Sequence, residues 1–280
     1  MKKTIICLAV LLSLGVFTVT AQDLTIPQPS TPQTIIQGFG LGQVTLTYSR
    51  PSVKGRKIFG YMEPYGKVWR TGANWATTIK FTDDVTMEGK SVAAGEYGLF
   101  SIPGQKEWIF ILNKTSKQWG AYTYKESDDV IRFTVPVKTT SALTETLTFD
   151  FANATPTDCF LQLNWEHVQT GLHLKIDVDT KVMANIDRAM QSDKKPYYSA
   201  AIYYYNNNKD LKKALEWMEV QDKAQPNSDN IKYWIARIKL KMGDKKGAIA
   251  TATEGLNLAT KANDVEYARM NKEVLADAAK

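Results

Sequence analysis

The sequence predicts an α+β chain, in which an antiparallel β-sandwich or barrel-like domain precedes an all-α helical-repeat region. Short runs rich in Thr, Val, Ile and aromatic residues recur at roughly ten-residue spacing up to residue 178. No long helical period lies between these runs, which favours an antiparallel sheet over βαβ units. From residue 180 onward the apolar pattern becomes helical and contains an internal repeat.

The N-terminus has the pattern of a secretory signal peptide over residues 1–21. Lys2 and Lys3 precede an apolar run at residues 5–19, and small residues follow at a cleavage point before Gln22. The run is shorter than the roughly 20 residues that span a bilayer. We therefore expect an exported protein with no stable transmembrane span after cleavage. Its destination would be the periplasm, the outer membrane or the medium of a Gram-negative bacterium.

Residues 22–33 are predicted as a linker, and the β domain is predicted to cover residues 34–178. Glycines at positions 89 and 95 mark chain reversals typical of hairpins. The expected strands lie at residues 43–49, 76–81, 85–89, 97–102, 107–113, 130–137, 147–151, 159–168 and 172–178.

The chain has two histidines, His167 and His173, on either side of Thr170 and Gly171. A two-residue turn at Thr170 and Gly171 keeps apolar residues on one face of a hairpin and separates the histidines. A three-residue loop centred on Thr170 would place them opposite each other but would mix apolar with charged side chains. We therefore predict no metal site, because zinc normally takes three or four convergent ligands. Cys159 is the only cysteine left after cleavage, so no intramolecular disulfide is expected.

The helical region, residues 180–280, repeats with a period of 34 residues. Asp210 and Asp244 are separated by this interval, and so are the small residues Ala214 and Ala248. A repeat of this length is typical of stacked helix pairs.

This period resembles the tetratricopeptide repeat, with units at about 193–226 and 227–260 and a capping helix over 264–279. The second unit departs from the pattern, because Gly255 stands where an alanine is usual and Lys239 where a tyrosine is usual. Stacked repeats need neighbours or a cap to bury their apolar faces. Such a region either packs only on itself and its neighbour or binds a protein or peptide partner.

The net charge of +6 is unevenly distributed. Residues 22–179 carry 15 basic and 16 acidic residues, whereas residues 180–280 carry 18 basic and 13 acidic residues. The basic residues of the helical region are mixed with acids, as on a solvated helical face. Nucleic-acid binding normally requires a concentrated basic stripe, which this mixed pattern lacks, so we predict no nucleic-acid partner.

Known catalytic patterns are missing from the chain. Gly89, Lys90 and Ser91 match the end of a phosphate-binding loop, but the required earlier glycine is absent. There is no G-x-S-x-G elbow and no H-E-x-x-H motif. We therefore predict no catalytic residues and no cofactor. A hydrolase with an acid pair assembled in space remains an alternative.

The β domain contains one concentration of basic and aromatic residues, between positions 50 and 75. Arginine donates paired hydrogen bonds to carboxylate or phosphate, and tryptophan offers a flat face to sugar rings. The segment is either a carbohydrate- or anion-binding rim or a solvated loop whose aromatics fill the edge of the sandwich. The candidate binding residues are Arg50, Lys54, Arg56, Trp69, Arg70, Asn74 and Trp75.

A set of phrases runs through the β domain: YSRPSVKGRKIFG, PYGKVWRTGANWATTIKF, AAGEYGLFSIPG, EWIFILN and QWGAY. Together they resemble the bacterial family catalogued as domain of unknown function 2911, over about residues 40–178. The resemblance implies an exported protein of a kind frequent in Bacteroidota, often with helical repeats after the domain. Position 75 is Trp here, where the family often has Glu or Ala. No activity comes with the resemblance.

The leading functional prediction is an exported, non-catalytic binding or scaffold protein whose helical region contacts a protein partner. The first alternative is a module that binds carbohydrate or a small anion at the basic and aromatic rim. The second alternative is the unrecognised hydrolase.

Overall fold

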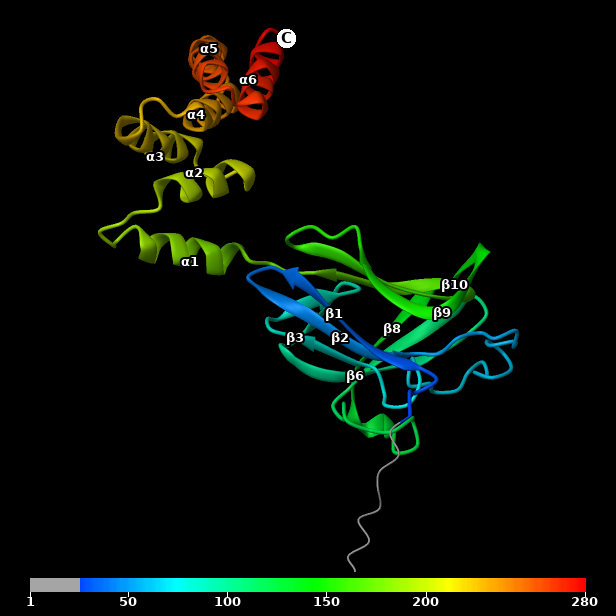
Figure 1. Ribbon diagram of the computed structural model, residues 1–280. Helices are drawn as coiled ribbons and strands as arrows, with labels where there is room; N and C mark the ends of the chain where they lie inside the picture. Colours follow the sequence, from blue (N-terminus) through cyan, green and yellow to red (C-terminus); the bar gives the residue numbers. More distant parts are fainter. Residues whose placement is uncertain (1–25) are drawn as a thin grey trace, which may run out of the picture. The chain divides into compact units, whose positions relative to one another are not determined.

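The computed structural model describes residues 26–280, so the predicted signal peptide lies outside the described residues. The chain divides into two compact units, one ending at Ile176 and one running from Asp177 to Lys280. The first unit is built of β-sheet and the second of helices, as the sequence pattern predicts (Figure 1).

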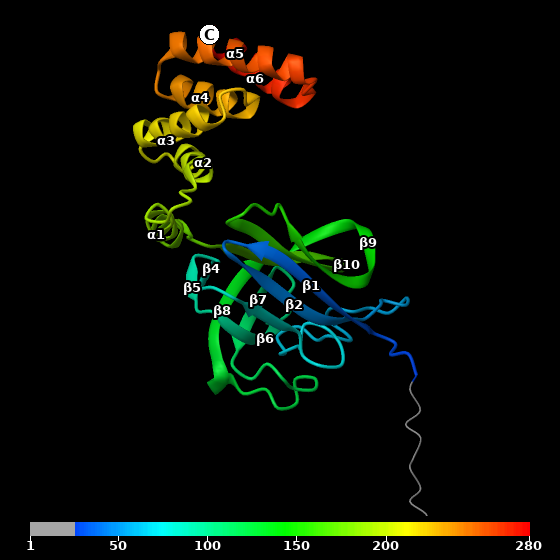
Figure 2. The same cartoon turned by 60° about the vertical axis from the view of Figure 1, so that its left-hand side comes forward.

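The first unit contains two antiparallel sheets. One has six strands in the order β1-β2-β3-β6-β7-β8, and the other has four in the order β5-β4-β10-β9. Figure 2 shows the two sheets from the side. The strands of the larger sheet are β1 (Thr31–Phe39), β2 (Gly42–Arg50), β3 (Thr78–Phe81), β6 (Gly95–Ile102), β7 (Glu107–Asn113) and β8 (Asp129–Pro136). Those of the smaller sheet are β4 (Val85–Met87), β5 (Lys90–Val92), β9 (Lys138–Ala152) and β10 (Asp158–Lys175).

The core of this unit forms where apolar side chains of the two sheets meet. Alternate residues of each strand point to the same face, so Leu46 and Tyr48 of β2 are buried together. The Tyr48 ring meets Phe149 of β9 edge to face, with centroids 5.0 Å apart. The Phe149 amide donates to the Tyr48 hydroxyl at 2.9 Å. Burial raises the pKa of Tyr48, which keeps its hydroxyl protonated in this contact.

Directly after β2, residues 51–53 leave the larger sheet and pair with β9 of the smaller sheet. The Leu147 amide donates to the Pro51 carbonyl at 2.9 Å, and the Val53 amide donates to the Glu145 carbonyl at 2.7 Å. Arg50 stabilises this corner, because its Nε donates to the Leu147 carbonyl at 3.0 Å. The two sheets are therefore joined by backbone hydrogen bonds as well as by the core.

Two strands lie outside the predicted set, β1 and β5. β1 begins at Thr31, inside the predicted linker, and pairs with β2 along its whole length. It is an edge strand and its residues are mostly exposed or half-buried, so its sequence lacks a long apolar run. β5 has three residues, too few to show a period.

The predicted turn at Thr170 and Gly171 is wrong. The chain reverses earlier, within β10. The two ends of this element meet, since the Ile176 amide donates to the Thr157 carbonyl at 3.0 Å. Glu166 has φ of 55°, a left-handed conformation typical of tight reversals. Gly171 instead lies so close to the Leu161 carbonyl that a side chain would not fit.

The second unit contains six helices: α1 (Asp179–Ala189), α2 (Tyr197–Asn206), α3 (Leu211–Ala224), α4 (Asp229–Lys241), α5 (Lys245–Ala262) and α6 (Val265–Ala278). The helices α3 and α5 start 34 residues apart, at Leu211 and Lys245. Asp210 and Asp244 cap these helices by accepting hydrogen bonds from backbone amides. Ala214 and Ala248 are both fully buried, so the repeated small residues occupy equivalent packed positions. None of the helices in residues 26–280 is long and apolar enough to cross a membrane.

Candidate functional site

The loop at residues 68–77, which leads into β3, is fixed by its own hydrogen bonds. The Trp69 amide donates to the Ser101 carbonyl at 2.7 Å, and the Ser101 amide donates back to Trp69 at 2.9 Å. Thr71 and Asn74 have φ of 55° and 59°, so the backbone turns sharply at both. The Thr77 hydroxyl donates to the Thr71 carbonyl at 2.8 Å, which closes the loop. The loop is therefore a firm support for the side chains it carries.

Trp69 belongs to the core. Its ring stacks on Trp165 of β10, with centroids 5.7 Å apart and planes at 17°. Phe59 and Trp108 complete an aromatic cluster around it. The Trp69 Nε1 donates to the Gly72 carbonyl at 3.0 Å, so both the apolar and the polar part of the indole are satisfied.

Arg70 lies close enough to the half-buried carboxyl group of Glu63 to act on it electrostatically. Its Nε is buried and has no hydrogen-bond partner. Burial raises the pKa of Glu63 to about 7, and the positive charge of Arg70 opposes this shift without cancelling it. Glu63 therefore carries the titrating group of these loops, and Arg70 favours its charged form.

Trp75 presents its indole to solvent, in contrast to Trp69. Its side chain is 58% exposed, and it meets Trp119, which is 51% exposed. Backbone hydrogen bonds hold the two together: the Gly120 amide donates to the Asn74 carbonyl and the Ala76 amide donates to the Gln118 carbonyl, both at 2.9 Å. The tryptophan pair therefore sits on two backbone segments that are fixed to each other.

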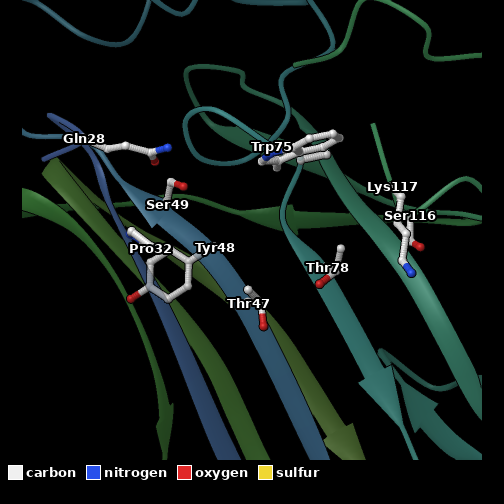
Figure 3. A pocket seen from close by; sticks show the side chains of 10 residues that line it. Gln28, Pro32, Thr47, Tyr48, Ser49, Trp75, Thr78, Ser116 and Lys117 are labelled. Atoms are coloured by element: carbon white, nitrogen blue, oxygen red, sulfur yellow. The ribbon is translucent and has the colours of Figure 1, made fainter. Parts of the chain in front are cut away.

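A groove of about 350 Å³ opens beside Trp75 (Figure 3). This volume is at the lower end of the range of about 300–1,000 Å³ that is typical of small-molecule sites. Ser116 and Lys117 lie on one side, Gln28 and Pro32 lie on the other, and Thr47 and Thr78 lie between them. The lining residues are Gln28, Pro32, Thr47, Tyr48, Ser49, Trp75, Ala76, Thr78, Ser116 and Lys117.

Thr47 and Thr78, between the two walls of the groove, belong to a row of small residues across neighbouring strands. Thr34, Thr47 and Thr78 stand opposite one another on β1, β2 and β3, and Gly98 of β6 continues the row. The hydroxyls of Thr34 and Thr47 are hydrogen-bonded at 2.9 Å. A Cβ at Gly98 would lie 3.0 Å from the Thr115 carbonyl, so glycine allows the neighbouring loop to lie over β6. Because this loop carries Ser116 and Lys117, Gly98 helps to form the groove wall.

Asn74 positions the opposite wall. Its Nδ2 lies 3.1 Å from Gln28 Oε1, 3.1 Å from the Ser30 carbonyl and 3.4 Å from Ser49 Oγ, and donates to these acceptors. The amide thus holds the segment before β1 against β2. Its positive φ suits asparagine, which tolerates this conformation better than most residues.

The loop that carries Trp119 is fixed at its far end by a polar network. The Tyr124 hydroxyl donates to Asp129 at 2.7 Å, and Arg132 Nε donates to the same carboxylate at 2.8 Å. Asn113 Nδ2 also donates to Asp129, at 2.9 Å. Burial and the Asp129 carboxylate raise the pKa of Tyr124 to about 12, so this hydroxyl remains a donor at physiological pH.

The seven predicted binding residues do not form one site. Trp75 lines the groove and Asn74 positions its wall, whereas Trp69 is buried in the core. The guanidinium groups of Arg50 and Arg56 donate hydrogen bonds to main-chain carbonyls, and that of Arg50 also donates to a threonine hydroxyl. The Lys54 amide donates to Glu145 at 2.8 Å, which ties its loop to β9.

Sequence reasoning missed Gln28, Ser116, Lys117 and Trp119. These residues lie in segments far from residues 68–77 in the chain and come together through sheet register and loop pairing. The phrase QWGAY, in which a tryptophan precedes a glycine, was the one available signal, because it marks an aromatic residue at a turn.

The two histidines have separate partners. His167 Nδ1 lies 3.0 Å from the Thr140 carbonyl, and His173 Nε2 lies 2.7 Å from Asp158 Oδ1. In residues 26–280, no group of three or more His, Cys, Asp or Glu side chains is placed to hold a metal ion.

Comparison with known families identifies the β unit. The family model described as Protein of unknown function (DUF2911) matches residues 30–174. The chain belongs to this family. The DUF2911 match begins one residue before β1 and ends within β10, so it covers both sheets and all groove residues except Gln28. No curated protein and no solved structure matches the chain.

Proposed function

We propose that this chain is a non-catalytic binding protein that takes a carbohydrate in the groove beside Trp75. The observation that carries the proposal is the exposed pair Trp75 and Trp119 at the edge of a hydroxyl-lined groove. Contiguous exposed aromatic surface is typical of interaction sites.

The chemistry of the groove suits a sugar better than a purely apolar ligand. A pyranose ring has an apolar C–H face that can pack on an indole, and hydroxyls at its edge that need hydrogen bonds. Trp75 offers the flat face, and Gln28, Thr47 and Thr78 offer side-chain amide and hydroxyl groups. A few placed polar groups in a mainly apolar pocket are typical of small-molecule sites.

The groove does not support the alternative of a glycoside hydrolase. Inverting and retaining enzymes need two carboxyl groups that flank the scissile bond. The groove lining contributed by the described part of the chain includes no Asp and no Glu. The proposal is therefore binding without bond cleavage.

Isothermal titration with neutral and acidic oligosaccharides tests the proposal. We expect saturable binding of at least one saccharide, with Trp75→Ala and Trp119→Ala each lowering affinity by tenfold or more. Tyr61→Ala is the matched control, because Tyr61 is 78% exposed and does not line the groove. Binding that survives both tryptophan substitutions, or the absence of binding to every saccharide, would contradict the proposal.

The helical unit supports a second proposal, contact with a protein partner through tetratricopeptide-like helix pairs. What favours it is a set of large apolar side chains left exposed on the unit: Val220, Met242, Ile249 and Val265. Such residues are typical of contact surfaces when they cluster. Chemical crosslinking in envelope fractions should give a discrete adduct for the full chain and lose it on Val265→Glu. An unchanged adduct, or none with the wild type, counts against this role.

Both proposals assume an exported protein. The basic start and apolar run of residues 1–21 are the support for export, and the family resemblance favours a Bacteroidota source. Fractionation of expressing cells, with N-terminal sequencing of the mature chain, tests this assumption. A cytoplasmic protein that retains Met1 would refute it.

A further inference from the structure

We infer that the saccharide of this groove is acidic and that Lys117 binds its carboxylate or sulfate group. This inference rests on the proposed carbohydrate function and adds the class of sugar. Among the described residues that line the groove, Lys117 and Tyr48 are the two with ionisable side chains.

The Lys117 ammonium group has no partner within residues 26–280. Among the described residues, none accepts a hydrogen bond from its Nζ or forms an ion pair with it. Two carboxylates near its loop are engaged by neutral donors instead. Glu96 accepts from the Ser116 hydroxyl at 3.0 Å, and Asp128 accepts from the Thr115 hydroxyl at 3.2 Å. An ammonium group is thus left for a ligand.

The position of Lys117 fits this role. Its backbone is fixed by its neighbours, because Gln118 Nε2 donates to the Thr115 carbonyl at 2.9 Å and the Thr115 amide donates to Asn113 Oδ1 at 2.9 Å. Lys117 lies with Ser116 on the wall opposite Gln28 (Figure 3). A sugar ring lying against Trp75 would therefore have an ammonium group on one side and an amide on the other.

The chemistry of lysine defines the class but not the acid. An ammonium group is a compact point charge with rotatable donors, so it does not select planar carboxylate over tetrahedral sulfate, as a guanidinium fork would. The class is a glycan that carries either group, such as a uronic acid or a sulfated hexose. A neutral glycan would leave the charge of Lys117 unused.

The experiment compares three probes on the full chain: galactotetraose, tetragalacturonate and a sulfated galactose oligosaccharide. We expect at least one acidic probe to bind fivefold or more tightly than galactotetraose. This preference should disappear in Lys117→Gln, which keeps a similar length but removes the charge. Raising the salt concentration should weaken binding of the acidic probe to the wild type and leave its binding to the variant unchanged.

Lys114→Gln is the matched control, because Lys114 lies on the same loop, is exposed and does not line the groove. It should keep the acidic preference. Equal binding of neutral and acidic probes, or a preference that survives Lys117→Gln, would overturn the inference while leaving the carbohydrate proposal intact. Failure of all three probes, together with other saccharides, would overturn both.

Discussion

Trp75 and Trp119 meet edge to face, with ring centroids 5.5 Å apart and planes at 85°. This is a favoured geometry for two aromatic rings, and it leaves about half of each side chain in solvent. The pair is therefore oriented before any ligand arrives. Pre-ordered aromatic surface lowers the entropy that binding would cost.

The tryptophan pair should contribute little to stability for its size. Because each ring is only half-buried, we expect Trp119→Ala to lower the free energy of unfolding by about 1 kcal/mol. Trp108→Ala, at a fully buried position, should cost about 3–5 kcal/mol. Urea unfolding of the two variants measures the difference. Similar losses for both would mean that Trp119 serves the fold rather than a surface.

Asn74 should be more important for stability than its place in a loop suggests. Asn74→Ala removes donors to Gln28, Ser30 and Ser49 and places alanine at a positive φ, so we expect a loss of about 1–3 kcal/mol. Asn153→Ala is the control, because Asn153 has φ of 52° and is exposed. If thermal unfolding shows equal losses, backbone strain alone explains the effect.

Glu63 should make stability depend on pH. Its pKa is raised from 4.5 to about 7 in the folded chain, so between these values the folded state binds more protons than the unfolded state. The contribution of Glu63 to stability is therefore greatest below pH 4.5 and is lost as the pH rises through 7. The loss is about 2 kcal/mol after allowance for solvent screening.

Glu63→Gln should remove this dependence. Between pH 5 and pH 8, the free energy of unfolding of the variant should rise by about 2 kcal/mol relative to that of the wild type. Glu107→Gln, at an exposed position, supplies the control. Urea midpoints at the two pH values give the comparison, and a constant difference between Glu63→Gln and the wild type would refute the prediction.

The fold was largely predictable because buried strands and helices have different periods. The predicted and observed bounds of β7 (EWIFILN) agree. This strand lies between β6 and β8 and is buried on both faces, so its sequence is a nearly continuous apolar run that is easy to recognise. β1 was not predictable in this way, since its partner is a single strand and its outer edge is solvated. The reversal near Glu166 was missed because glycine, not glutamate, is the usual sign of a left-handed residue.

The site was only partly predictable. Trp75 stood out by composition, but its exposure depends on the turn at Asn74 and on a loop more than forty residues away. Trp69 has the same chemistry six residues earlier and is buried. Side-chain type therefore identified the segment, whereas the three-dimensional pairing decided which tryptophan faces solvent.

Gly255 shows a departure from the repeat pattern that the structure explains. A Cβ at this position would lie 2.6 Å from Asn271 Oδ1 and 2.9 Å from its Cγ. Asn271 of α6 is fully buried, and its Nδ2 donates to the Tyr267 carbonyl at 2.9 Å, so it has little room to move. Glycine at residue 255 thus allows α5 and α6 to pack closely.

Gly255→Ala should therefore destabilise the chain, although alanine favours a helix by about 1 kcal/mol. We expect a net loss of about 1–3 kcal/mol from overpacking. The double variant Gly255→Ala with Asn271→Ala should recover part of that loss, because the second change removes the atoms that clash. A double-mutant cycle by urea unfolding measures the coupling between the two positions. Additive effects would show that the contact between Gly255 and Asn271 does not explain the glycine.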